Sequence, residues 1–153
     1  MTWPDVALDP ITRLRAVAAR YPSAGICETV LDVPFADTWA WVTDFEHSVP
    51  RFDSQLTRAK ITRRDGDHVK MLVWAKHVPV PLPIDACVEP GFCLMRGRAR
   101  TYLVVMAAVP TVDGGTRFVH CEAMPWPGLS FLRPIIQRIV EADIRGLRRM
   151  VCT

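Results

Sequence analysis

Three side chains in the last third of the chain have the chemistry to exchange protons, namely His120, Glu122 and Asp143. His120 and Glu122 alternate with apolar residues over 116–124, so a strand there places both on one face. Asp143 falls within a helical repeat of apolar residues that begins at Ser130, near the middle of the apolar arc. A carboxylate in that position needs a partner, a cavity or a proton. If the face that carries His120 turns inward, the three groups form a proton-transfer cluster.

The other face of the same strand gives a second interpretation, because it carries Val119, Cys121 and Ala123. With these residues inward, His120 and Glu122 are solvated and the strand offers no acid or base to the interior. We favour this second arrangement, because a wall of small residues suits a curved sheet.

Asp143 has Gly146 one helical turn further along the chain. A glycine inside a helix costs about 1 kcal/mol relative to alanine, so this one needs a reason. In one interpretation Asp143 pairs with an arginine or histidine of the core, and Gly146 merely permits close packing. In the other, the carboxylate faces a ligand and the missing side chain leaves room for it. The sequence leaves both interpretations open.

Spacing and turn signals predict the elements that must position these groups. Asp9-Pro10 predicts the start of a helix whose apolar stripe ends at Tyr21. A strand over 26–33, a short helix over 34–45 and a second short helix or turn over 46–49, interrupted by Pro50, are expected next. The sequence then predicts six strands and a terminal helix that begins at Ser130; the strands cover 56–64, 68–76, 84–89, 92–98, 100–109 and 116–124.

The segment 78–83 is predicted to be a loop, because its prolines lack amide donors. Only the terminal helix is long and apolar enough to cover a sheet of this size. A curved sheet that grips one helix leaves a hollow between them, and small ligands bind in such hollows.

The composition predicts one globular domain in a reducing compartment. The chain has 153 residues, of which 50% are hydrophobic and 23% are charged, so a disordered chain is excluded. A net charge of +3, with the arginines dispersed, argues against a nucleic-acid surface. The five cysteines are an odd number without a C-x-x-C pair, which favours free thiols.

Several classes of site are absent from the sequence. His47, His68 and His77 lack the spacing of metal ligands, and no nucleophile, phosphate-binding or dinucleotide motif occurs. No apolar run reaches the roughly 18 residues of a membrane span. We therefore expect no metal, no cofactor, no nucleic-acid partner, no stable membrane insertion and a cytoplasmic location. The terminal helix carries five arginines, which we expect mostly on its outer side, at positions 133, 138, 145, 148 and 149.

Residues 29–52, which read TVLDVPFADTWAWVTDFEHSVPRF, combine a strand, a proline corner, a helix with a central Trp and a proline before an aromatic residue. Together with Gly114-Gly115-Thr116-Arg117 and the terminal helix, this pattern resembles the SRPBCC superfamily. That group includes START-related lipid-transfer domains, polyketide cyclase/dehydrase-like proteins and Bet v 1-like proteins. The resemblance covers residues 26–151. Phe52 stands where many members have Trp, and the first helix lies outside the common pattern.

The resemblance implies an α+β helix-grip fold, in which a curved seven-stranded antiparallel sheet surrounds the long C-terminal helix. The extra N-terminal helix would form an extension over residues 1–24, and the ligand-binding domain would cover 25–153. The resemblance also implies an elongated hydrophobic cavity. We expect that cavity to be lined by Val69, Met71, Val73, Tyr102, Val104, Met106, Ile136, Ile139, Asp143, Gly146 and Leu147.

The function implied by the resemblance is binding or transport of a hydrophobic small molecule, such as a lipid, a quinone or a polyketide-like compound. The alternative is an enzyme of the polyketide cyclase or dehydratase type, with Asp143 as acid or base and His120 and Glu122 as further candidates. We favour the binding protein, since the superfamily shares a container rather than a catalytic motif. A third hypothesis assigns the N-terminal helix a contact with a partner or with a second copy in a homodimer.

Overall fold

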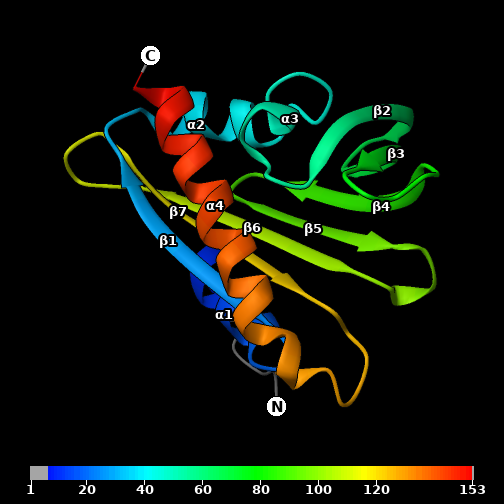
Figure 1. The fold of residues 1–153 in the computed structure, drawn as a ribbon. Helices are drawn as coiled ribbons and strands as arrows, with labels where there is room; N and C mark the ends of the chain where they lie inside the picture. The colour runs from blue at the N-terminus through cyan, green and yellow to red at the C-terminus, as the bar shows by residue number, and fades with distance from the viewer. Residues whose placement is uncertain (1–6, 153) are drawn as a thin grey trace, which may run out of the picture.

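A computed structural model describes residues 7–152, which form four α-helices and seven strands (Figure 1). The first part contains α1 (Pro10–Ala18), β1 (Gly25–Leu31), α2 (Phe35–Val42) and α3 (Val49–Phe52). Six strands follow, namely β2 (Leu56–Asp65), β3 (His68–Ala75), β4 (Leu82–Glu89), β5 (Phe92–Gly97), β6 (Leu103–Pro110) and β7 (Thr116–Ala123). The chain ends with α4 (Arg133–Val151), and short 3₁₀ turns occupy Arg98–Arg100 and Ser130–Leu132.

The seven strands form one antiparallel sheet in the order β1-β7-β6-β5-β4-β3-β2. The first strand therefore lies at an edge, beside the last one. The long helix α4 crosses one face of the sheet, while α1 lies behind the other face (Figure 1). This arrangement confirms the predicted α+β helix-grip fold with an additional N-terminal helix.

Both faces of the sheet carry a buried apolar core. On the concave face, side chains of β3, β6 and β7 pack against α2, α3 and α4. On the convex face, α1 buries Ile11, Leu14 and Ala18 against Val119, Cys121, Ala123 and neighbours from β5 and β6. The small residues of β7 thus lie under α1, where short side chains let a helix approach the sheet. The preference for this face as the inner wall was wrong, because the sequence alone did not show where α1 would pack.

The N-terminal helix is joined to its own sheet by polar contacts as well as by apolar packing. Asp9 caps it, because its Oδ1 accepts hydrogen bonds from the amides of Ile11 and Thr12, both at 3.1 Å. After the helix, Ser23 Oγ donates to the Met124 carbonyl at 2.8 Å and accepts from the Met124 amide at 2.9 Å. The apolar side of α1 therefore packs against the sheet of its own chain.

Two prolines occupy places that differ from those predicted. Pro50 lies in the first turn of α3 rather than ending a helix, because the first helical positions need no intrahelical amide donor. Pro83 lies near the start of β4, where it is opposite Leu72, so the strand begins two residues before the predicted one.

The next strand, β6, begins at Leu103 rather than at residue 100. The chain before it forms a 3₁₀ turn in which Ala99 has a φ of 58°. A residue in the left-handed region cannot continue a strand, which explains the later start.

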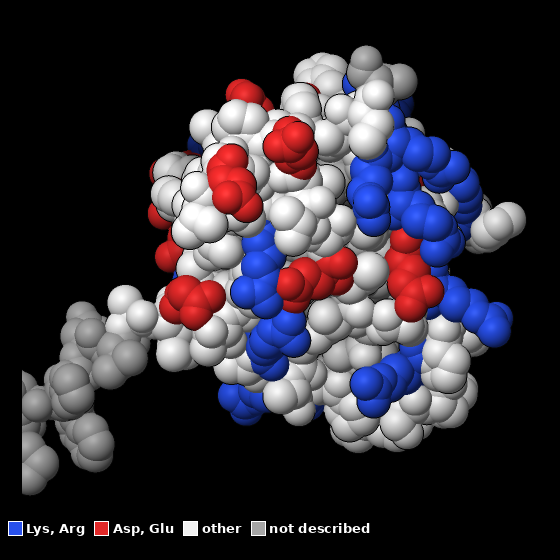
Figure 2. Space-filling view, turned by 90° about the vertical axis from the view of Figure 1, so that its left-hand side faces the viewer, with Lys and Arg blue, Asp and Glu red and all other residues white. Residues whose placement is uncertain are grey.

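Acidic and basic side chains alternate over much of the face shown in Figure 2, with a denser group of basic ones on its right-hand side, where α4 lies. The predicted outer positions of the α4 arginines are confirmed, since all five are exposed: Arg133, Arg138, Arg145, Arg148 and Arg149. Within residues 7–152, no helix is both long enough and apolar enough to cross a membrane.

Candidate functional site

The structure brings His120, Glu122 and Asp143 together in the interior. The strand β7 places His120 and Glu122 on the concave face, and α4 places Asp143 opposite them. His120 Nε2 lies 3.1 Å from Glu122 Oε1 and 3.2 Å from Asp143 Oδ2. The side chains of the three residues are only 4%, 3% and 1% exposed, respectively. The three groups therefore meet as the first interpretation requires, and proton transfer among them stays a prediction.

Further groups extend this cluster in two directions. The Tyr102 hydroxyl donates a hydrogen bond to Glu122 Oε2. On the other side, the Ser54 amide donates to Asp143 Oδ1 at 2.6 Å. Residue by residue, hydrogen-bonding contacts therefore link Tyr102 to Glu122, His120, Asp143 and finally Ser54.

A third carboxyl group lies close to the cluster. Asp53 Oδ1 accepts hydrogen bonds from the amides of Gln55 and Leu56, both at 2.8 Å, and so shapes the turn that presents Ser54 to the helix. Burial raises the pKa of Asp53, and the Asp143 carboxylate raises it further. The half-buried Asp53 thus adds a third carboxyl group beside the two buried ones, and ionisation of one opposes ionisation of its neighbours.

The pKa values of Glu122 and Asp143 are shifted in opposite directions. Burial raises the pKa of Glu122 well above its usual range, and the carboxylates of Asp143 and Asp53 add to that effect. Burial also raises the pKa of Asp143, but hydrogen bonds from His120 and Ser54 outweigh it and lower the pKa overall. The two opposite shifts therefore favour a state in which Glu122 keeps its proton while Asp143 is ionised.

Gly146 does not leave room for a ligand in this structure. A Cβ added at Gly146 would lie 2.5 Å from the backbone oxygen of Phe52 and 3.1 Å from its Cα. The absent side chain lets α3 approach α4, which is the close-packing interpretation. The same approach brings Ser54, two residues further along, to Asp143.

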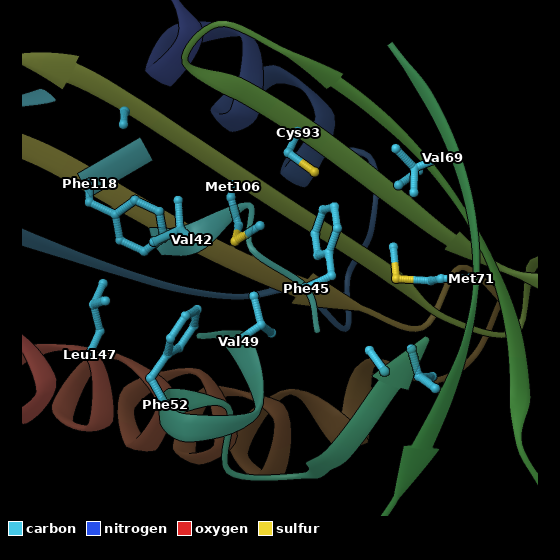
Figure 3. Packing of buried hydrophobic residues seen from close by; sticks show 14 of the residues in the cluster. Val42, Phe45, Val49, Phe52, Val69, Met71, Cys93, Met106, Phe118 and Leu147 are labelled. Carbon is cyan, nitrogen blue, oxygen red and sulfur yellow. The ribbon is translucent and has the colours of Figure 1, made fainter. Parts of the chain in front are cut away.

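The predicted cavity wall is part of a packed core in this structure (Figure 3). Among the predicted wall residues, the buried cluster on the concave face contains Val69, Met71, Val73, Met106 and Leu147, and Val104 packs against it. Ile136 is buried and Ile139 is half-buried. Phe45, Val49, Phe52 and Phe118 belong to the same buried cluster and point into the space between the sheet and α4 (Figure 3). The predicted wall residues therefore lie among other buried side chains, and a ligand that enters between them would have to displace some of these side chains.

Sequence reasoning missed Asp53 and Ser54. An aspartate followed by polar residues ahead of a strand is a turn signal, so the turn itself could have been predicted. Its position against Asp143 depends on the packing of α3 on α4, which leaves no mark in the spacing of residues.

The same three side chains have the donor set of a small metal site. His120, Glu122 and Asp143 each offer one ligand atom, and these atoms lie within 4.8 Å of one another. A metal-binding histidine usually donates a hydrogen bond from its second ring nitrogen. His120 Nδ1 has no hydrogen-bond partner within residues 7–152, so the geometry fits a shared proton better than a metal ion.

Comparisons with known proteins support the fold. No protein-family model matches the chain, and no curated protein matches it in sequence. Similar solved structures include the Zhui aromatase/cyclase from Streptomyces sp. R1128, which is 10% identical with a TM-score of 0.65, over 84% of this chain and 92% of that one. A START superfamily protein from Mycobacterium smegmatis is 14% identical with a TM-score of 0.59, over 84% of this chain and 96% of that one.

A third similar structure is the di-domain ARO/CYC protein BexL from the BE-7585A biosynthetic pathway. It is 12% identical with a TM-score of 0.66, over 82% of this chain and 45% of the larger one. At such low identities the likeness shows a shared fold alone, because one fold hosts many activities.

Proposed function

We propose that this chain, which has an SRPBCC-type helix-grip fold, binds a hydrophobic small molecule between the concave face of its sheet and α4. The polar end of the ligand would meet His120, Glu122 and Asp143. The ligand class is a lipid, a quinone or a polyketide-like compound, because an apolar core surrounds a single polar cluster.

One observation carries this proposal. His120 Nδ1 and Ser54 Oγ are buried, and neither has a hydrogen-bond partner within residues 7–152. Both belong to residues that contact Asp143. Leaving a buried polar atom unpaired costs about 1–3 kcal/mol. A hydroxyl or carbonyl group on a ligand would satisfy these atoms, and the apolar side chains around them would hold the rest of the molecule.

Ligand entry requires the packed core to open. Met71 and Met106 lie in that core, and methionine is the side chain that adapts most readily to a new neighbour. Apolar surface buried against the ligand contributes about 25 cal/mol per Å² before the costs of association are subtracted.

The proposal can be tested with two apolar probes, decylubiquinone and oleate, and with protein purified from its source. Native mass spectrometry should detect a co-purified apolar compound. Methyl NMR should show saturable shifts of Met71 and Met106 on titration with at least one probe. A Ser54→Ala variant keeps the hydrogen bond from its backbone amide to Asp143 but lacks the hydroxyl. It should bind the probe about three- to tenfold more weakly, because one hydrogen bond to the ligand is lost.

The exposed Ser130 provides a matched control, since Ser130→Ala removes the same hydroxyl at the surface. Absence of a co-purified compound together with unshifted methionine signals would contradict the binding proposal.

A second function, acid–base catalysis, is favoured by the opposite pKa shifts of Glu122 and Asp143. A pair of carboxyl groups separated in this way can supply one acid and one base to the same substrate. In a cyclisation, Asp143 would accept a proton from an activated carbon while Glu122 would donate one to an oxygen.

For this second function, we expect the wild-type protein to turn over a poly-β-ketone substrate. The Asp143→Asn variant should keep the fold but lose this turnover. Wild-type turnover by Asp143→Asn would remove Asp143 from the mechanism. If the protein binds the substrate but forms no product, only the binding function remains supported.

A further inference from the structure

A pocket lies at the end of the sheet where α1 finishes. It has a volume of about 260 Å³ and is lined by Arg20, Tyr21, Arg96, Tyr102, Leu103 and Pro125. Leu103 belongs to the core beneath α1, and Tyr21 packs against that core. Two of the residues that line the pocket therefore belong to the convex side of the sheet, whereas Tyr102 reaches Glu122 on the concave side.

The walls of this pocket are joined to one another by hydrogen bonds. The two bonds between Ser23 and Met124 hold the end of α1 beside the end of β7. The Gly97 amide donates to the Tyr102 carbonyl at 2.8 Å and closes the turn between β5 and β6. The two segments that supply the arginines are thus each fixed to the sheet.

The residues that line the pocket include two arginines and no acidic residue. Elsewhere on and near α1, arginines are paired: Arg13 with Glu89, and Arg15 with Glu28. By contrast, neither Arg20 nor Arg96 has an ion pair or a side-chain hydrogen bond within residues 7–152.

The acidic residue opposite Arg96 in the neighbouring strand does not neutralise its positive charge through an ion pair. Asp85 lies opposite Arg96 in the β4–β5 pairing, yet no ion pair within 4.0 Å forms between them in the described chain. The Tyr102 hydroxyl is already used by Glu122. Among the side chains that line the pocket, those of Arg20, Arg96 and Tyr21 remain as hydrogen-bond donors for a ligand.

We propose that this pocket binds a small oxyanion, either a phosphate or phosphate monoester or a small carboxylate. Two guanidinium groups that face one cavity repel each other, and an anion between them replaces that repulsion with charge-assisted hydrogen bonds. The volume admits a small anion rather than a large ligand, since sites for drug-sized molecules begin at about 300 Å³. This inference goes beyond the proposed function; the two sites share Tyr102, which lines the pocket and donates to Glu122.

The test is an amide NMR titration of the full chain with sodium phosphate and, separately, with sodium acetate, at ionic strength held constant with chloride. Phosphate should produce saturable shifts around the pocket, with a Kd on the order of 1 mM for two charge-assisted contacts. Tighter binding of phosphate than of acetate identifies a phosphoryl ligand, and the reverse order identifies a carboxylate. Saturable binding of neither anion would overturn the proposal.

Arg20→Gln and Arg96→Gln should each weaken the binding about tenfold or more. Both side chains are exposed, so these variants should fold, and amide signals outside the pocket verify that they do. Arg64→Gln, at an exposed position on β2, is the matched control for the loss of one positive charge. Equal weakening by Arg64→Gln would show non-specific attraction and would also overturn the proposal.

Discussion

Replacement of Glu122 by glutamine should change how the stability of the protein depends on pH. The Glu122 side chain is 3% exposed, and its burial raises its pKa well above the ordinary value of 4.5, with Asp143 and Asp53 adding to the shift. A carboxyl group whose pKa is higher in the folded chain stabilises the fold at pH values below its unfolded pKa. That contribution is lost as pH rises from the unfolded pKa to the folded one.

The size of the effect follows from the one additional proton that the folded chain holds within this window. The free energy of unfolding falls by about 1.4 kcal/mol per pH unit for one such proton. Glutamine can still accept the hydrogen bond from Tyr102, but it has no proton to lose. Just above pH 4.5 the wild-type curve should therefore decline more steeply than the Glu122→Gln curve, by about 1.4 kcal/mol per pH unit. Asp53, whose pKa is also raised, contributes a decline that both proteins share.

Urea unfolding followed by tryptophan fluorescence, repeated between about pH 5 and pH 8, measures this difference. Glu141→Gln provides a control, because it removes a carboxyl group from α4 and leaves Glu122 in place. The control should keep the wild-type decline. Parallel curves for wild type and Glu122→Gln would refute the raised pKa and with it the assignment of Glu122 as an interior acid.

Gly146→Ala should lower the free energy of unfolding by about 1–2 kcal/mol, because overpacking outweighs the helix propensity that alanine adds. The added Cβ would lie 2.5 Å from the Phe52 oxygen. A variant that proves more stable than wild type in urea unfolding would contradict this packing. Gln137→Ala removes bonds of 2.9 and 2.8 Å to the backbone of the edge strand β1, so we expect a loss of about 1–2 kcal/mol and faster amide exchange at that edge; unchanged exchange would argue against the contact. Burial raises the pKa of Cys93 and of Cys121 to about 12, so a disulfide reagent at mildly alkaline pH should leave both thiols unlabelled until the chain unfolds.

Local periodicity was sufficient to predict the elements and the inward position of Asp143. A carboxylate inside an apolar helical stripe must face whatever the helix covers, and α4 covers the sheet. The order of strands and helices along the chain could be predicted in the same way, from alternation and turn residues. These features depend on residues close together in the chain, so the sequence displays them directly.

The inner face of β7 could not be predicted in this way. Both of its faces carry side chains that can be buried, so alternation defines two faces without saying which one α4 covers. The answer depends on α1, a segment about a hundred residues earlier in the chain, which covers Val119, Cys121 and Ala123. The contact of Gly146 with Phe52 and the meeting of Arg20 with Arg96 in one pocket are likewise properties of packing.

Burial of the polar cluster in an otherwise apolar core costs free energy. Among the described residues, His120 is the basic side chain that lies within 4.0 Å of both Glu122 and Asp143. Replacing buried ionic groups by apolar residues of similar volume is often neutral or stabilising in proteins. Stability therefore does not account for two buried carboxyl groups and a buried histidine beside the half-buried Asp53. If Glu122→Gln proves as stable as wild type at low pH and more stable at neutral pH, the retained acid must contribute something other than stability, which recognition of a polar ligand group or proton transfer would supply.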